Sequence, residues 1–324
     1  MIEHIQKQFA VTRDLHNKRL DVVVSELMPE YSRSQISSWI KSNSILVNEK
    51  PYKPKDKAQE GDRISINVQF EPINPDFNVC KPENIPLNIV YEDDDVLVIN
   101  KQAGLVVHPG AGNREHTLVN ALLHHAPSLQ HLARAGIIHR LDKDTTGLLI
   151  VAKNLKAHNS LTQQMQAREI NRQYITLVYG HIISGSTIET GFGRHPKNRL
   201  KMTVCDHGRE AITHYSINKQ YFDFTLLDVQ LMTGRTHQIR VHLNYIKHPV
   251  VGDPLYGGRV RFPAQASQML IIALQQFKRQ ALHAAKIEFI HPANNKKLIF
   301  TAALPDDFST LLKTMDEDYE NKKS

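Results

Sequence analysis

Cysteine is nearly absent from this sequence, which has only Cys80 and Cys205 among its 324 residues. Two cysteines so far apart provide neither a disulfide framework nor a cysteine-based zinc site. Long apolar runs are also missing, because no stretch approaches the length that spans a bilayer and residues 1–8 contain no apolar signal-peptide core. We therefore expect a cytoplasmic protein without a membrane segment.

Several common site motifs are missing as well. The sequence contains no Gly-x-Gly-x-x-Gly, no P-loop and no nucleophile elbow, which excludes the usual dinucleotide, nucleoside-triphosphate and α/β-hydrolase sites. Its 18 histidines are scattered, and none forms His-Glu-x-x-His or pairs with a cysteine. We therefore expect no bound metal.

The composition is that of a folded protein with a basic surface. Hydrophobic residues make up 41% and charged residues 23%, which argues against global disorder. A chain of 324 residues exceeds one ordinary core, so we expect two domains. Lysine and arginine (40) outnumber aspartate and glutamate (33), and this net charge of +7 favours a polyanionic partner.

Residues 18–66 are expected to form a small module. Apolar residues recur at helical spacing over residues 20–27 and 36–40, and Ser32 is the expected N-cap of the second helix. A short strand, a lysine-rich loop and a second strand follow. This order of elements resembles the S4 RNA-binding domain.

The polar face of the second helix presents Arg33, Gln35 and Lys41. Such a face, together with a lysine-bearing loop, can contact phosphates without distinguishing bases. A solvated helix face is the alternative interpretation of the same residues.

The rest of the chain is divided by composition and periodicity. Residues 1–17 are expected to be an N-terminal extension, and residues 67–84, which contain three prolines, a linker. Residues 85–324 form the second domain in this interpretation, including a C-terminal helix. Strands and helices alternate there without a regular βαβ order, which indicates an α+β fold. We expect strands over residues 88–91, 96–99, 172–179 and 224–231, and helices over residues 155–168, 238–246 and 267–278.

Chemically active residues concentrate between two apolar runs. The sequence His-Arg-Leu-Asp-Lys-Asp-Thr-Thr-Gly at residues 139–147 lies between Ile-Ile and Leu-Leu-Ile-Val, so charged groups are placed at the end of a buried strand. Arg140 and Lys143 flank Asp142 and favour its ionised form, which can act as nucleophile or base. A turn-capping aspartate is the alternative role.

Five motifs together resemble those of the RNA pseudouridine synthases. His-Arg-Leu-Asp at residues 139–142, followed by Thr-Thr-Gly-Leu-Leu, is similar to that family's catalytic signature. The other similar motifs lie at residues 95–109, 172–174, 234–243 and 252–257. The resemblance covers nearly the whole chain. It implies a catalytic domain with a mixed, largely antiparallel sheet flanked by helices, behind an S4-like domain.

The resemblance also implies roles for particular residues. Asp142 would be the catalytic carboxylate that attacks C1′, attacks the base, or removes a proton from C2′. Arg240 would pair with Asp142 and keep it ionised and aimed, and Tyr174 would stack on the displaced uracil. Arg140 would fill the gap that the flipped nucleotide leaves in the RNA. Arg235 would contact phosphate only.

A second basic stretch, between the aromatic and arginine motifs, offers further phosphate contacts through Arg194, Lys197 and Arg199. The reaction implied by the resemblance is an isomerisation, which requires no cofactor. The implied substrate is a stem-loop of large-subunit ribosomal RNA, naked or in a pre-ribosomal or assembled subunit, and the protein is expected to act as a monomer. Two alternatives stay open: a ribosome-associated RNA-binding or assembly factor, and a transfer-RNA synthase of the same family.

Overall fold

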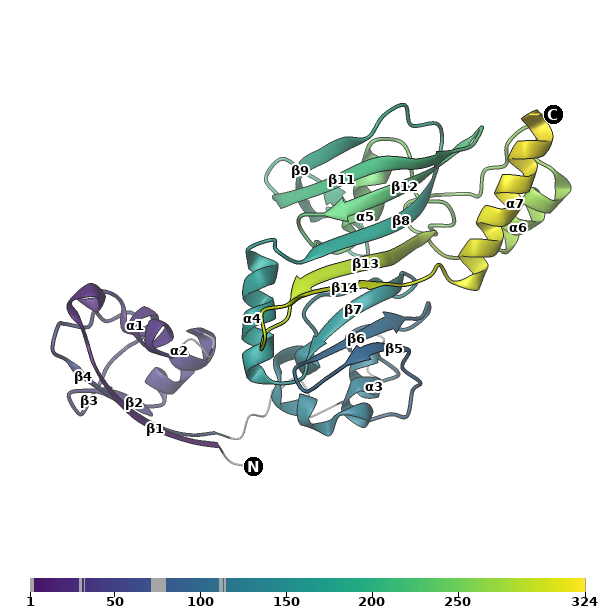
Figure 1. The fold of residues 1–324 in the computed structure, drawn as a ribbon. Helices are drawn as coiled ribbons and strands as arrows, with labels where there is room; N and C mark the ends of the chain where they lie inside the picture. Colours follow the sequence, from purple (N-terminus) through teal and green to yellow (C-terminus); the bar gives the residue numbers. More distant parts are fainter. Residues whose placement is uncertain are drawn as a thin grey trace. The chain divides into compact units, whose positions relative to one another are not determined.

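The structure of the protein, a computed structural model, describes residues 3–28, 31, 33–70, 80–110, 113 and 115–323 (Figure 1). The chain folds as two compact units, an N-terminal unit that ends before residue 79 and a C-terminal unit that contains most of the remainder. Among the described residues, no helix is both long and apolar enough to cross a membrane.

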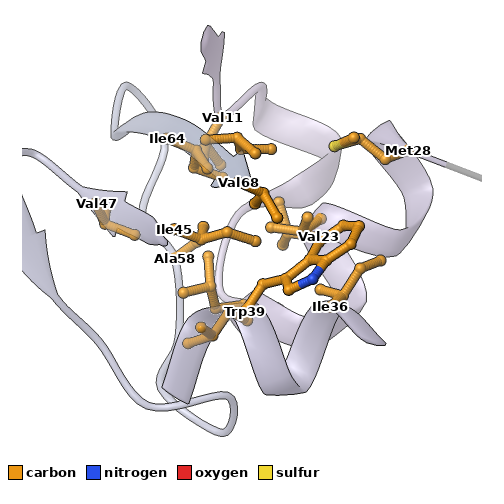
Figure 2. Close-up of a cluster of buried hydrophobic side chains, with 14 of the residues drawn as sticks. Val11, Val23, Met28, Ile36, Trp39, Ile45, Val47, Ala58, Ile64 and Val68 are labelled. Atoms are coloured by element: carbon orange, nitrogen blue, oxygen red, sulfur yellow. The ribbon is translucent and has the colours of Figure 1, made fainter. Parts of the chain in front are cut away.

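The N-terminal unit combines two helices with a four-stranded sheet in the order β1-β4-β2-β3. The elements are β1 (Glu3–Ala10), α1 (Leu20–Leu27), α2 (Arg33–Lys41), β2 (Ile45–Val47), β3 (Lys50–Pro51) and β4 (Arg63–Phe70). The helical spacing seen in the sequence marks the buried faces, since Val23 of α1 and Ile36 of α2 are both fully buried. They pack with Trp39, Ile45 and Ile64 in one apolar cluster (Figure 2).

Residues 1–17 were expected to be an extension, and here the structure differs. Strand β1 pairs antiparallel with β4 along its whole length, from Glu3 opposite Phe70 to Ala10 opposite Arg63. Val11 and Leu15, which follow β1, are buried in the apolar cluster. The strand was missed because its apolar residues, Ile5 and Phe9, are separated by polar ones. Ser32, the expected N-cap of α2, and the side chain of Gln35 lie outside the described residues.

The C-terminal unit is built on one sheet whose main path runs β10-β9-β11-β12-β8-β13-β7-β6-β5, with β14 paired to β13. Every pairing is antiparallel except that of β7 with β13, so the expected mixed, largely antiparallel sheet is confirmed. The strands are β5 (Ile89–Glu92), β6 (Val96–Lys101), β7 (Thr146–Ala152), β8 (Asn171–Tyr179), β9 (Ser186–Arg194), β10 (Met202–Val204), β11 (Arg209–Gln220), β12 (Phe224–Leu231), β13 (Leu282–Ile290) and β14 (Lys297–Thr301).

Of the five α-helices described in the C-terminal unit, the middle three begin and end within two residues of the predicted positions, the last is the expected C-terminal helix, and the first was not predicted. The five are α3 (Leu118–His125), α4 (Leu155–Gln166), α5 (Gln238–Tyr245), α6 (Gln268–Gln276) and α7 (Asp306–Lys323). Side-chain caps explain two of the starts: Asn154 accepts from the backbone N–H of Ala157 at α4, and Ser267 accepts from that of Leu270 at α6. Helices α6 and α7 pack against one another (Figure 1).

The parallel pairing of β7 with β13 places the chemically active residues at mid-sheet. Thr146 lies opposite His283, and Gly147 lies opposite Ala284. Gly147 has a φ of +112°, and a Cβ built there would lie 2.3 Å from the carbonyl oxygen of Ala284, so only glycine fits this close approach. Tyr174 of the neighbouring strand β8 is also opposite Ala284. The turn that precedes β7 therefore lies beside Tyr174.

Candidate active site

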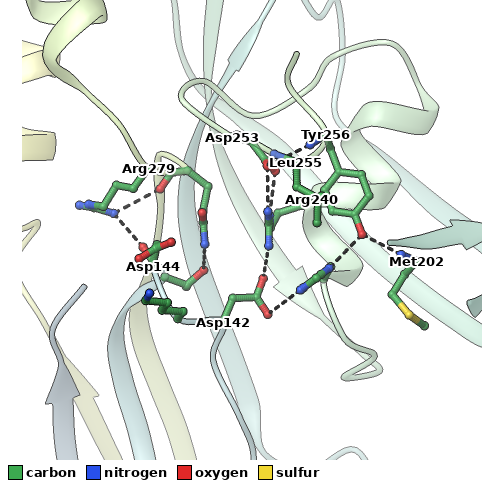
Figure 3. A network of polar contacts seen from close by, with 12 residues as sticks. Asp142, Asp144, Met202, Arg240, Asp253, Leu255, Tyr256 and Arg279 are labelled. Atoms are coloured by element: carbon green, nitrogen blue, oxygen red, sulfur yellow. Dashed lines mark hydrogen bonds and ion pairs between the residues drawn. The ribbon is translucent and has the colours of Figure 1, made fainter. Parts of the chain in front are cut away.

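A turn at the start of β7 carries Asp142, whose carbonyl oxygen accepts from the backbone N–H of Thr145 at 3.1 Å. Two residues of the segment before β13 hold this turn. Gln280 donates to the hydroxyl of Thr145 at 3.0 Å, and Arg279 donates to the carbonyl of Asp144 at 3.3 Å (Figure 3). The Asp142 side chain, 14% exposed, is thus presented from a braced backbone.

Lys101, at the end of β6, braces the same turn from below the surface. Its ammonium donates to the carbonyl oxygens of Gln102, Leu105 and Lys143 at 2.8, 3.0 and 2.8 Å, which uses all three of its hydrogens. Burial lowers the pKa of Lys101 to about 7, although the charges of Asp144 and Asp142 oppose that shift. The lysine therefore fixes the backbone next to Asp142 while lying 2% exposed.

Arg240 of α5 lies between two carboxylates. Its Nη1 donates to Oδ2 of Asp142 at 2.8 Å, while Nε and Nη2 donate to the two carboxylate oxygens of Asp253 at 2.7 and 2.8 Å (Figure 3). Burial disfavours the charge on this guanidinium, but its hydrogen bonds to Asp253 and the charges of both carboxylates outweigh it and raise the pKa of Arg240. The bidentate contact with Asp253 aims the third donor at Asp142.

His237, which precedes α5, lies on the other side of Asp142. Burial lowers the pKa of its imidazole even though the charge of Asp142 opposes this, and so favours the neutral ring. The hydroxyl of Tyr256 accepts from the backbone N–H of Met202 at 2.8 Å and lies 2.9 Å from Nδ1 of His237. We assign the Tyr256 proton to that contact, which leaves the His237 proton on Nε2, 3.9 Å from Oδ1 of Asp142.

Five residues predicted from the sequence line one cavity of about 40 Å³. They are Asp142, Arg140, Tyr174, Arg235 and Arg240. A volume of this size holds only a few water molecules, so a pyrimidine ring must lie at its mouth or displace side chains. The structure thus brings together residues that are up to 100 positions apart in the sequence.

Tyr174, on β8, is 4% exposed within this cavity. Burial raises the pKa of its hydroxyl, which the nearby charge of Arg172 opposes. Arg140 is exposed at the edge of the cavity. Arg235 is half-buried, and its Nε donates to the carbonyl of Glu210 at 3.2 Å.

The predicted RNA-contacting residues are not among the residues that line this cavity. Arg33 begins α2 and Lys41 ends it, and both are exposed. Arg194, Lys197 and Arg199 are exposed at the connection between β9 and β10. Arg194 also donates to the carbonyl of Arg199 at 2.8 Å, which holds this connection closed.

Four side chains that the sequence analysis left without a role complete the cluster. His237, Asp253, Tyr256 and Lys101 all lie inside the quoted motifs, but sequence spacing does not reveal which of them meet. Asp253 is 111 positions from Asp142, and the two come together only because Arg240 contacts both. Lysine side chains are rarely buried in proteins, so nothing in the sequence indicated that Lys101 is part of the site.

A group of side chains suited to a cation lies at the other end of β6 and β7. One ligand atom from each of Asp93, Asp95 and His291 lies within 4.8 Å of the others. The Asp93 carboxylate already accepts from the backbone N–H groups of Asp95 and Val96 at 2.8 Å. It also contacts the hydroxyl of Tyr91 and the ring of His291, so groups of the protein already occupy both carboxylate oxygens.

Comparison with known proteins places this geometry in a family. Residues 95–245 match the family described as RNA pseudouridylate synthase, and residues 18–64 match the S4 domain. The ribosomal large subunit pseudouridine synthase D of Xanthomonas campestris pv. campestris is 46% identical over 312 residues, which are 96% of this chain and 93% of that protein.

Two further similarities agree. The protein of the same name from Pseudomonas aeruginosa is 45% identical over 320 residues, which cover 99% of each chain. Among solved structures, human RNA pseudouridylate synthase domain containing 1 superposes with a TM-score of 0.54 at 27% identity, over 71% of this chain and 87% of that one. The chain therefore belongs to the RNA pseudouridylate synthase family.

Proposed function

We propose that this protein converts specific uridines of large-subunit ribosomal RNA to pseudouridine and that Asp142 is its catalytic residue. The observation that carries the proposal is the Asp142 carboxylate, 14% exposed at a cavity and 2.8 Å from a buried arginine. The naming of the similar proteins supports the choice of ribosomal RNA.

The reaction asks for a carboxylate and a base-binding surface. The bond between N1 and C1′ breaks, the uracil turns, a bond forms between C5 and C1′, and the proton on C5 is lost while N1 gains one. An ionised Asp142 can attack C1′ as it becomes electron-poor, as carboxylates do in glycosidases, or it can attack the base or remove the C2′ proton, and each of these routes uses the carboxylate form. Tyr174 offers its ring to the turning uracil and its hydroxyl to a late proton transfer.

Arg140 and Arg235 have separate roles in this scheme. A uridine inside a stacked helix cannot reach Asp142, so the nucleotide must leave the stack. Arg140 is exposed beside the cavity and would occupy the gap left in the RNA. Arg235 would contact a phosphate of the flipped nucleotide.

Five further basic residues and Gln35 would bind the RNA outside the catalytic cavity. We assign phosphate contacts to Arg33, Gln35, Lys41, Arg194, Lys197 and Arg199. We also propose residues 18–66 as the RNA-binding domain and residues 85–324 as the catalytic domain, with β1 added to the first. The expected substrate is a stem-loop, and the protein would act as a monomer in the cytoplasm.

Mapping pseudouridines tests this function directly. Ribosomal and transfer RNA from cells that lack the gene are compared with RNA from cells complemented with the wild-type protein or with Asp142→Asn. We expect large-subunit sites that are lost without the gene and restored only by the wild type. Loss confined to transfer RNA would contradict the substrate, and restoration by Asp142→Asn would contradict the catalytic assignment.

A further inference from the structure

A second cavity, of about 670 Å³, adjoins the catalytic cluster. The connection between β9 and β10 forms one wall with His195 and Lys201, and the end of α5 forms another with Asn244, Tyr245 and Lys247. This volume is many times that of the cavity at Asp142, and it is large enough for a nucleotide.

Tyr256 separates the two cavities. It lines the larger one, its hydroxyl lies 2.9 Å from Nδ1 of His237, and its ring faces the Arg240 guanidinium at 5.1 Å. The ammonium of Lys201 lies over the same ring at 5.8 Å. One aromatic side chain thus touches both the catalytic cluster and the lining of the second cavity.

The lining is suited to a nucleotide. His195, Lys201 and Lys247 supply cationic or hydrogen-bonding groups, and no carboxylate occurs among the described lining residues. Tyr245 is 54% exposed, which leaves a large aromatic face open to solvent. Cationic side chains beside open aromatic faces are the combination that proteins use to bind unstacked nucleotides.

Chain connectivity makes the target RNA the natural source of that nucleotide. A uridine flipped out to reach Asp142 stays covalently joined to its two neighbours, so the RNA strand must leave the catalytic cavity along adjoining surface. The larger cavity begins behind Tyr256, one side chain away from the catalytic cluster. A neighbour that is also unstacked can enter it without any break in the strand.

We propose that this cavity binds a second, unstacked nucleotide that adjoins the target uridine, and so contributes to the choice of sequence context. Its base stacks on Tyr245, and Lys201 and Lys247 bind its phosphate. The proposal rests on the proposed function, because it takes the bound strand to be the substrate RNA.

The test combines variants of the protein with abasic RNA. The probe is the shortest large-subunit ribosomal stem-loop that the wild-type protein converts, synthesised intact and with an abasic residue at each position that flanks the target. We expect Tyr245→Ala to lower kcat/KM on the intact RNA by about ten-fold, the value of one lost stacking contact. One abasic position should cost the wild type the same factor and cost Tyr245→Ala nothing more.

Two controls separate a binding role from damage to the fold. Phe222→Ala removes an aromatic side chain that is 50% exposed and outside both cavities, and it should leave kcat/KM unchanged. Lys247 has a φ of +71°, so Lys247→Asn removes the charge with a residue that tolerates this conformation. Lys247→Asn should lower kcat/KM by the same factor on intact and on abasic RNA, since Lys247 binds phosphate and not a base.

The outcomes distinguish this proposal from the function on which it rests. If the wild type converts the stem-loop but every abasic position costs the wild type and Tyr245→Ala the same factor, no flanking base uses the cavity and the proposal is wrong. If the wild type converts no ribosomal stem-loop, the proposed function is wrong and this inference falls with it.

Discussion

Each of the two units contains a cluster of arginine and aspartate side chains, but the ratio of arginine to aspartate is reversed between them. In the N-terminal unit one carboxylate, Asp21, accepts from two arginines, Arg19 and Arg33, at 3.0–3.2 Å. In the C-terminal unit one arginine, Arg240, donates to two carboxylates, Asp142 and Asp253. The first cluster carries one excess positive charge, and the second carries one excess negative charge.

The two clusters also differ in burial, since the arginines of the positive cluster are exposed and the negative cluster is largely buried. Arg19 and Arg33 are 50% and 54% exposed, whereas Arg240 is 6% exposed and Asp253 fully buried. The excess positive charge therefore faces solvent, where RNA phosphates can reach it. The excess negative charge is held on Asp142 at the cavity, where solvent screening is weak. This difference supports the proposal that the first cluster contacts RNA phosphate and the second takes part in the reaction.

The largest effect is expected at the shared arginine. Arg240→Ala should reduce kcat by at least about 1000-fold, because it leaves two partly or fully buried carboxylates without their cation. Arg240→Lys restores the charge but not the two-pronged geometry, and should stay at least ~100-fold below wild type. Single-turnover pseudouridine formation on a ribosomal stem-loop measures both. Arg168→Ala, which removes an exposed pair with Glu210, is the control.

Asp253→Asn should have an intermediate effect. The amide keeps the size of the side chain but replaces one accepting oxygen of a charged pair, which costs about 1.5–3 kcal/mol and hence roughly 10- to 100-fold in kcat. The loss should appear in kcat with little change in KM, since Asp253 is buried away from RNA. Asp316→Asn changes an exposed pair with Lys219 and should change neither constant. An Asp253→Asn enzyme of wild-type kcat would show that Asp253 does not aim Arg240.

A smaller effect is expected in the N-terminal unit. Arg33→Ala should raise KM a few-fold, leave kcat unchanged, and reduce the slope of log affinity against log salt by about one unit. RNA affinity measured at several salt concentrations between about 50 and 200 mM gives this slope. Lys219→Ala supplies the control for loss of a surface cation. An unchanged slope in Arg33→Ala would mean that Asp21 fully occupies this arginine.

The last prediction concerns the stability of the C-terminal unit and its dependence on pH, not a rate constant. Burial lowers the pKa of Lys101 to about 7 in the folded protein. In the unfolded chain this lysine has its ordinary pKa of about 10.4, so it keeps its proton to a higher pH. The unfolded state thus binds more protons in that window, and the free energy of unfolding should rise from pH 7 toward pH 10. Lys101→Met should lose this rise. Denaturant unfolding at several pH values measures it, and parallel profiles for the two proteins would contradict the assignment.

Much of the fold and of the catalytic cavity could be predicted, because the relevant patterns are local. Helical spacing gave α1 and α5, and alternation gave β8 and β12. The motif pattern also gave the pairing of Arg240 with Asp142. Local patterns failed where strands are polar, as in β11, whose 12 residues mix threonine, histidine and charged side chains with few apolar ones.

The contacts that complete the site depend on tertiary structure. Asp253 and Tyr256 reach the cluster from a loop after α5, and Lys101 reaches it from β6. Their sequence spacing does not fix these distances. The order of the strands in the sheet decides which distant segments of the chain meet at the site. Strand β1 also depends on a distant partner, because β4 lies some sixty positions away and its pairing completes what the weak apolar pattern of β1 did not reveal.

The central claim is that the carboxylate of Asp142 performs the chemistry while other groups hold the RNA. Purified Asp142→Asn tests it most directly, in a single-turnover assay paired with an RNA-binding measurement. We predict pseudouridine formation below ~0.1% of wild type. RNA affinity should stay within a few-fold, since a lost negative charge does not weaken contact with phosphate. Turnover by Asp142→Asn at a rate comparable to that of the wild type would contradict this account.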